Sequence, residues 1–185
     1  MAELAAAHPR AEVELWTMDE HRLGLKPIIR VVWAKEGERP VVPVNHRYEW
    51  LYVYCFVRPT TGETCWLLMP EVSSVAFSLA LEHFARQVGA GEGKRVLLVL
   101  DAAGYHTGKD VRVPEGIELE FQPAYSPELQ PAEHLWPLTD EGIANRLFAT
   151  LGELEEALAA RCVALAERPE LIRSATLFHW WPRAA

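Results

Sequence analysis

Two aspartates follow runs of residues that are typical of β-strands, at positions where the chemistry of an α/β fold usually collects. Asp19 follows the alternating run 13–18, and Asp101 follows the continuous apolar run 96–100. Sites in open α/β sheets lie at the ends of strands, so we predict that the two carboxylates lie side by side if their strands are neighbours. Like charges that close raise one pKa unless cations lie between them. Mg²⁺ prefers oxygen ligands and keeps several waters, so two or three carboxylates suffice to bind it.

A third carboxylate, Glu133, follows a proline-rich stretch, residues 121–137, that contains four prolines. Pro131 suits the first turn of a helix, where its missing N–H is not needed, and a carboxylate in that turn complements the helix dipole. The earlier prolines restrict the loop before folding and so reduce the entropy lost on ordering it. Pro137 is expected to kink the helix or to mark a later helix start. We predict that this stiff loop directs Glu133 toward Asp19 and Asp101, where a metal pair would activate water and stabilise the leaving oxygen of a phosphodiester.

The elements that must position these acids follow from the hydrophobic periodicity. Strands are predicted over residues 13–18, 28–34, 50–57, 63–69, 96–100 and 117–121, with a short, proline-interrupted edge strand at 41–45. Helices are predicted from Ser73 or Ser74 to residue 88, and over residues 131–145, 151–167 and 170–178, after a frayed lead-in at 1–11. Strands first, then alternating helix and strand, then helices, predict an α/β fold with one mixed sheet and helices on both faces.

Composition narrows the class of protein. The chain has 185 residues, 50% of them hydrophobic, which suits one globular domain over residues 1–185. No run approaches the length of a membrane span, and the opening residues lack the pattern of a signal peptide. The three cysteines have no C-x-x-C spacing, so we expect them to pack in the core of a cytoplasmic protein. A free-standing nucleic-acid binder usually has an excess of basic residues, so with a net charge of −8 any such surface must be local, or the main DNA-binding module must lie on another chain.

Three segments together resemble the acidic blocks of transposases in the mariner-like superfamily, with its bacterial insertion-sequence branch as the nearest match. These segments are MDEHRLGLKP, LLVLDAAGYHTG and QPAYSPELQPAEHLWP, and the likeness covers about residues 13 to 147. The resemblance implies a ribonuclease-H-like fold, a five-stranded mixed sheet flanked by helices, and cut-and-paste transposition of DNA by a DDE triad. It implies that Asp19, Asp101 and Glu133 are both the catalytic residues and the ligands of two Mg²⁺ or Mn²⁺ ions.

The resemblance also implies roles around the triad. Glu20 matches an acid that commonly follows the first aspartate, and His106 matches a histidine that often follows the second. Arg22 and Lys26 are candidates for binding phosphate, and Tyr125 and Ser126 for touching DNA, although turn and loop roles stay open for all four. Trp136 is expected to pack in the core beneath the site. DNA is the implied partner, as transposon ends and target, in a homo-oligomeric complex associated with the bacterial nucleoid.

The chain departs from the family pattern in three places. Gln130 and Ala102 stand where family members commonly have Asn, and the N-terminal helix-turn-helix region that binds transposon ends is absent from residues 1–185. That region could be encoded separately, which would also account for the acidic charge. Two alternative functions stay open. One is a structure-selective nuclease of the same fold, and the other is a non-catalytic DNA-binding or assembly remnant of a transposase.

Overall fold

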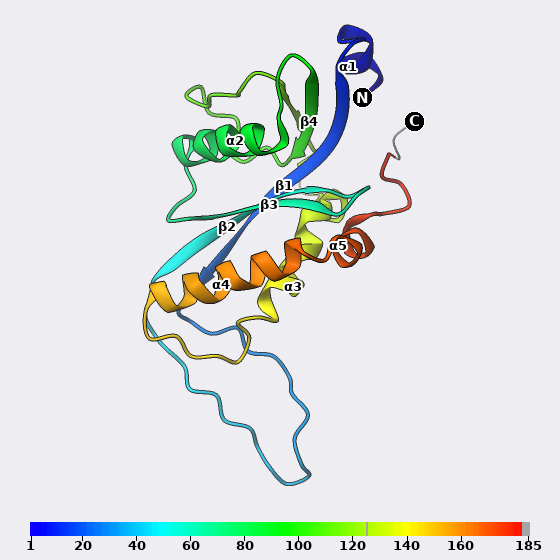
Figure 1. Ribbon diagram of the computed structural model, residues 1–185. Coiled ribbons are helices and arrows are strands. Elements are labelled where there is room, and N and C mark those ends of the chain that lie inside the picture. The colour runs from blue at the N-terminus through cyan, green and yellow to red at the C-terminus, as the bar shows by residue number, and fades with distance from the viewer. Residues whose placement is uncertain (125, 183–185) are drawn as a thin grey trace.

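The computed structural model describes residues 1–124 and 126–182, which form one sheet with helices on both sides (Figure 1). The five strands are β1 (Glu12–Gly24), β2 (Trp50–Arg58), β3 (Glu63–Met69), β4 (Lys94–Leu100) and β5 (Ile117–Phe121). The α-helices are α1 (Ala2–Ala7), α2 (Ser74–Val88), α3 (Trp136–Asp140), α4 (Leu151–Ala166) and α5 (Pro169–Thr176). Two short 3₁₀ helices, η1 (Pro127–Leu129) and η2 (Pro131–Leu135), precede α3.

The strand order is β3-β2-β1-β4-β5. β1 pairs with β2, and β2 with β3, in antiparallel fashion, whereas β1 pairs with β4, and β4 with β5, in parallel. The predicted five-stranded mixed sheet is therefore confirmed. Parallel neighbours place the ends of β1 and β4 at the same edge of the sheet, which is the arrangement that the two aspartates require.

Each face of the sheet has its own hydrophobic cluster. Helix α2 covers one face, where Phe77 and Phe84 pack against residues of β1, β2 and β4. Residues of η2, α3, α4 and α5 cover the other face over β2 and the second half of β1, as Figure 1 shows. The three cysteines are unpaired and buried, as predicted. Within the described ranges, no helix combines the length and the apolar character that crossing a bilayer requires.

Strand β1 is longer than predicted, and Asp19 is not its last residue. The antiparallel ladder with β2 continues past Asp19, which pairs with Cys55, as far as Gly24, which pairs with Trp50. The parallel ladder with β4, in contrast, ends at the pair Thr17–Val99. The prediction that Asp19 ends a strand is therefore wrong for β1 as a whole, because β2 supplies a partner where β4 does not.

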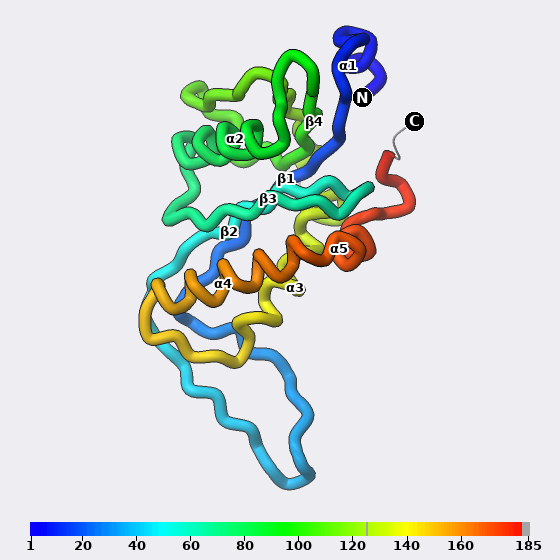
Figure 2. Tube along the Cα trace, in the orientation of Figure 1, coloured from blue at the N-terminus to red at the C-terminus, as the bar shows by residue number. Residues whose placement is uncertain are grey.

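The strands predicted at residues 28–34 and 41–45 are wrong. Residues 26–49, here called the arm, form an extended loop that projects from the body of the molecule (Figures 1 and 2). Backbone hydrogen bonds hold it at its base, from Leu25 N to Glu49 O, and at its tip, from Glu38 N to Lys35 O. The side chain of Asn145 bonds both backbone groups of Arg30. No described strand forms a β-ladder with the arm, so its β-branched residues have no neighbouring strand.

The remaining differences concern helices. The lead-in contains the short helix α1. The single helix predicted over 131–145 is divided into η2, α3 and turns. Pro137 lies in the first turn of α3, so the prediction that it marks a later helix start is confirmed. Helices α2 and α4 match their predictions because the side chains of Ser73 and Thr150 cap them, at Ala76 N and Glu153 N.

Candidate active site

A groove of about 420 Å³ lies at the edge of the sheet where β4 ends. The three acids singled out from the sequence, Asp19, Asp101 and Glu133, all line it. The loop after β4, with Ala102 and Ala103, and the segment after β5, including Gln122 and Ser126, supply the rest of the wall. Residues more than a hundred positions apart thus face the same groove.

The sheet register explains why the two aspartates are neighbours. The last parallel pair of β1 and β4 is Thr17–Val99, and Asp19 and Asp101 each lie two residues beyond it. Side chains two residues apart in a strand point to the same face. Asp19 and Asp101 therefore lie side by side at the same edge of the sheet, as predicted from the sequence, although β1 itself continues past Asp19.

Gln130 attaches the segment that carries Glu133 to the sheet. Its Nε2 donates to the carbonyl oxygen of Met18 at 2.9 Å, and its Oε1 accepts from the hydroxyl of Thr17. The same Oε1 accepts from Ala132 N and so caps η2, the helix of Glu133. Gln130 departs from the family pattern, and this role was not predicted from the sequence. Its place directly before Pro131, at a helix start, was the available signal.

Asp19 is held by an indole. Trp136 Nε1 donates to Asp19 Oδ2 at 2.9 Å. Burial raises the pKa of Asp19, the indole hydrogen bond opposes this, and the charges of Glu20 and Glu133 raise it further, to about 7. The expectation that Trp136 packs beneath the site is confirmed, since its side chain is buried in the cluster beside η2. Its hydrogen bond to the acid was not predicted.

Asp101 is held by a histidine. His106 Nδ1 lies 2.7 Å from Asp101 Oδ1, and its Nε2 lies 2.9 Å from Glu20 Oε1. Burial lowers the pKa of His106, but the hydrogen bond and charge of Glu20 outweigh it and, with the charge of Asp101, raise the pKa above its usual value. A protonated imidazole donates from both nitrogens. His106 therefore joins Asp101, an acid of the predicted triad, to Glu20, the acid that the sequence singled out beside Asp19.

The donor chemistry of the groove fits hard divalent cations. Its acids offer carboxylate oxygens, and a bound cation would relieve the like-charge effect that raises the pKa of Asp19. Among the described residues, no three His, Cys, Asp or Glu side chains are already gathered tightly enough to hold an ion. The three acids therefore line the same groove, but their carboxylates do not lie close enough together to form a complete set of metal ligands.

The remaining candidates lie in different places. Ser126 lines the groove. Arg22 is exposed and stacks over Trp50, with its Cζ 5.5 Å from the ring centroid, and Lys26 is exposed at the base of the arm. Neither basic residue lines the groove. Tyr125 lies outside the described residues.

We expect Asp19→Asn to stabilise the metal-free protein. The pKa of Asp19 rises from 3.8 to about 7 on folding, so wild-type stability falls between these pH values. The amide keeps an acceptor for Trp136 and loses the charge. The gain should grow from pH 4 to pH 7 and reach on the order of 2 kcal/mol at pH 8, since each pKa unit is worth about 1.4 kcal/mol and partial exposure reduces the total. Urea unfolding in EDTA at pH 4.5 and pH 8 measures it, and an equal effect at both pH values would contradict it.

Comparison with known proteins places this site in a family. A family model described as "DDE superfamily endonuclease" matches residues 14–155, a range that contains all three acids. An uncharacterized protein of Sinorhizobium fredii, y4pE/y4sA, is 32% identical over 136 residues, which are 73% of this chain and 99% of that protein. The resemblance to DDE enzymes that the motifs indicated is thus confirmed.

Solved structures agree on the fold. The Mos1 mariner paired-end complex with Mn matches with a TM-score of 0.59 at 18% identity, over 96% of this chain and 60% of that chain. The Mos1 strand transfer complex matches with a TM-score of 0.56 at 19% identity, over 97% of this chain and 60% of that chain. The chain thus spans about 60% of the length of the Mos1 chains. The ribonuclease-H-like fold predicted for the sheet is confirmed.

Proposed function

This chain belongs to the DDE superfamily of endonucleases, and from that premise we propose that it is the catalytic domain of a cut-and-paste DNA transposase. One observation carries the proposal. Asp19, Asp101 and Glu133, from three separate parts of the chain, line the same groove. The Mos1 complexes with transposon ends and after strand transfer support DNA as the substrate, since they share this fold.

The proposed site residues act through their carboxylates. Asp19 and Asp101 would share two Mg²⁺ or Mn²⁺ ions, and Glu133 would complete their coordination. When bound, such ions lower the pKa of water and stabilise the charge on a leaving phosphodiester oxygen. The residues of the chain fix the geometry: Trp136 and His106 each hold one oxygen of an aspartate, and Gln130 holds the start of the helix of Glu133.

Two displacements at phosphorus make up the proposed reaction. Water first replaces the 3′-oxygen at a transposon end, which leaves a 3′-hydroxyl and a 5′-phosphate. That hydroxyl then replaces a 3′-oxygen in target DNA, so one phosphodiester bond forms as another breaks. No covalent bond between protein and DNA is required. The proposal is tested by incubating labelled terminal-repeat DNA with the protein in Mn²⁺ or Mg²⁺: cleavage with joining supports it, cleavage alone indicates a nuclease, and metal binding without cleavage indicates a remnant.

We propose that recognition of transposon ends is assisted by a helix-turn-helix protein encoded separately. The net charge of −8 supports this, because phosphate binding rests on Lys and Arg. Arg30 contributes less than its charge suggests, since it pairs with Asp140 at 3.4 Å. The proposed location is the bacterial cytoplasm, on nucleoid DNA. Adding the helix-turn-helix protein should increase binding to terminal repeats over random DNA; equal binding with and without it would contradict this part.

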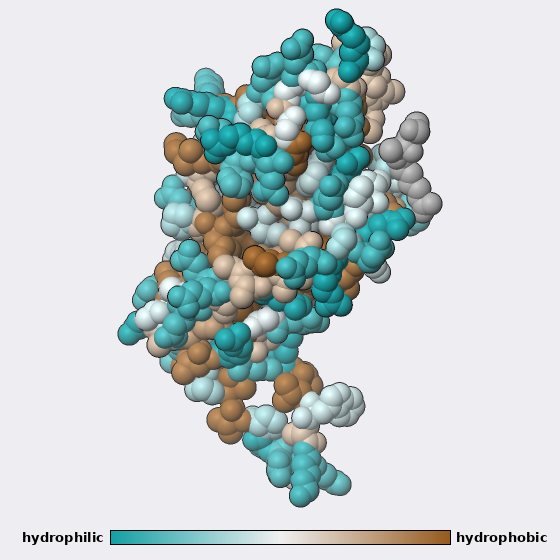
Figure 3. Space-filling model, viewed as in Figure 1, coloured by the Kyte–Doolittle hydropathy of each residue, from teal (hydrophilic) through white to brown (hydrophobic). Residues whose placement is uncertain are grey.

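The arm supports the proposed homo-oligomer. Val31, Trp33 and Val41 are 102%, 103% and 89% exposed, and hydrophobic atoms show on the projecting part at the bottom of Figure 3. Exposed apolar residues gathered on one segment mark an interaction surface. The arm has five Lys and Arg residues and three Glu residues, a net charge of +2. Because the whole chain has a net charge of −8, the rest of the chain has a net charge of −10. Opposite charges favour a second copy of the chain as the partner.

Replacing Val31 and Trp33 together with Ser is expected to weaken self-association about tenfold or more, because buried aromatic anchors dominate interface energies. Sedimentation velocity over a concentration series measures it. The matched control replaces Val75 and Leu79 of α2, which are 66% and 55% exposed, with Ser. It should leave self-association unchanged. A wild-type protein that stays monomeric at every concentration would contradict the role of the arm.

A further inference from the structure

We propose that Trp136 is a positioning residue for the site: its indole N–H fixes one oxygen of Asp19 so that the other is presented to the groove. The inference rests on the proposed function, because it concerns how Asp19 receives a cation. Trp136 itself does not line the groove. It acts through the acid and not on the substrate.

The indole is fixed from several sides. The ring of His21 stacks on it with centroids 5.0 Å apart and an interplanar angle of 15°, and Trp66 meets it edge-on at 6.5 Å. His21 is in turn held by Asp140, whose Oδ1 lies 3.0 Å from Nε2. Trp136 is only 7% exposed. A ring enclosed in this way cannot turn its N–H elsewhere, so the direction of the hydrogen bond to Asp19 Oδ2 is set by packing.

Trp136 also links two of the three proposed ligands. It is the first residue of α3 and the residue that ends η2, and its backbone N–H donates to the carbonyl oxygen of Glu133. One turn of chain therefore carries both the carboxylate of Glu133 and the donor for Asp19. A shift of this turn would move Glu133 and release Asp19 together, so the spacing Glu133-x-x-Trp136 couples the positions of the two acids.

Core packing alone does not account for the direction of this N–H. Trp66 lies in the same cluster, and its Nε1 donates at 2.9 Å to Thr64 Oγ1, a neighbour two residues away in its own strand. Trp136 Nε1 makes a bond of the same length to an acid 117 positions away in the groove. Groups that orient a metal ligand typically affect metal affinity or activity by about 10–100-fold. That is the effect assigned to the indole N–H.

The test compares Trp136→Phe with Trp66→Phe. Each variant keeps an aromatic ring and loses one indole hydrogen bond of 2.9 Å, but only the first bond reaches an acid of the groove. We expect Trp136→Phe to lower the affinity for Mn²⁺ alone, measured by titration followed by electron paramagnetic resonance, about 10–100-fold, and to lower the cleavage rate by a similar factor. Phe at position 66 keeps an aromatic ring edge-on to Trp136, so Trp66→Phe should leave both unchanged, and the two variants should melt at similar temperatures without metal.

Wild-type Mn²⁺ affinity and cleavage in Trp136→Phe would overturn the inference and leave the proposed function standing. Equal losses of Mn²⁺ affinity in both variants would also overturn it, because packing would then be the cause. A wild-type protein that neither binds Mn²⁺ nor cleaves DNA would overturn the proposed function, and this inference with it. The outcomes therefore separate a failure of the indole from a failure of the site.

Discussion

Asp101→Asn is expected to slow cleavage of a pre-nicked transposon end by at least about 10²–10³-fold, the usual effect of removing one group that stabilises transition-state charge. The substitution keeps the oxygen that accepts from Ala103 N and approaches His106 Nδ1. It removes the negative charge, which a bound Mg²⁺ requires. The side chain of Asp101 is 59% exposed, so the fold should not depend on it.

Single-turnover cleavage of a labelled end, with circular dichroism to check folding, measures this effect. Asp110→Asn is the control, because Asp110 is an exposed aspartate in the loop that follows the same strand and does not line the groove. It should cut at the wild-type rate. A folded Asp101→Asn protein that cuts as fast as wild type would remove Asp101 from the proposed set of ligands.

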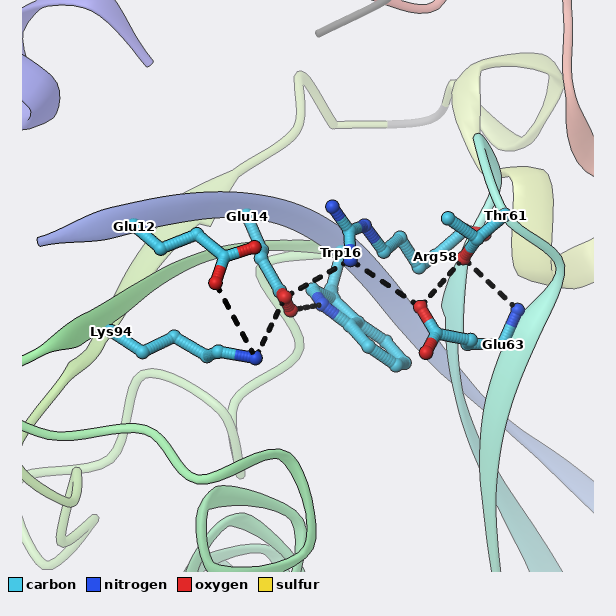
Figure 4. Close-up of polar contacts among 7 residues, drawn as sticks. All are labelled: Glu12, Glu14, Trp16, Arg58, Thr61, Glu63 and Lys94. Carbon is cyan, nitrogen blue, oxygen red and sulfur yellow. Dashed lines mark hydrogen bonds and ion pairs between the residues drawn. The ribbon is translucent and has the colours of Figure 1, made fainter.

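Glu14→Gln is expected to have the largest effect on stability, a loss of about 3 kcal/mol, the lower end of the range for removing one partner of a buried ion pair. Glu14 is 3% exposed and accepts hydrogen bonds from Lys94 at 2.9 Å, Arg58 at 3.0 Å and Trp16 at 2.7 Å (Figure 4). The neutral amide would leave two cations facing no buried charge. Both cations are partly exposed, which keeps the loss near the lower end.

The effect of Glu14→Gln should depend on pH in a defined direction. Burial raises the pKa of Glu14, but the hydrogen bonds of Lys94 and Trp16 and the charges of Arg58 and Lys94 outweigh it and hold the pKa below its usual 4.5. A depressed pKa gives stability that is present above 4.5 and is lost as the pH falls through the folded value. The difference between Glu14→Gln and wild type should therefore shrink in acid.

Urea unfolding at pH 7 and pH 3.5 measures both predictions. Glu12→Gln is the matched control: Glu12 is 60% exposed and lies 4.0 Å from Lys94, so its loss should be below about 1 kcal/mol. Equal losses for Glu12→Gln and Glu14→Gln at pH 7 would contradict the assigned role of the buried carboxylate. Glu14 lies toward the start of β1, away from the groove, so neither variant should change cleavage at a temperature where both are folded.

The local sequence pattern correctly predicted the strands that have a hydrogen-bonded partner strand in the sheet. The bounds of β3 and β5 agree with prediction, because turn residues end both segments and the sheet supplies partners along their length. The run 28–34 has the same β-branched character and is not a strand, since a strand also needs a neighbour, which no local pattern records. Asp19 shows the converse: β2 extends β1 beyond the residue where the hydrophobic alternation stops.

The acids of the site and His106 were predictable, whereas the positioning roles of Gln130 and Trp136 were not. Asp19 follows an alternating run, Asp101 follows a continuous apolar run, and Glu133 lies at a proline-marked helix start. Gln130 and Trp136 reach residues 112 and 117 positions away, and nothing near them in sequence indicates those partners. Long-range hydrogen bonds of this kind depend on the packed fold, so a single sequence identifies the groups that do chemistry before the groups that orient them.

The most direct test of the proposed function is a joining assay. A pre-nicked transposon end with a labelled strand is incubated with supercoiled target DNA, Mn²⁺ and the protein, and products are separated under denaturing conditions. We expect the label to become covalently attached to target DNA by wild-type protein, and not in EDTA or with Asp101→Asn. Hydrolysed ends without joined products, or joining that Asp101→Asn performs equally well, would contradict the assignment of this groove to transposition.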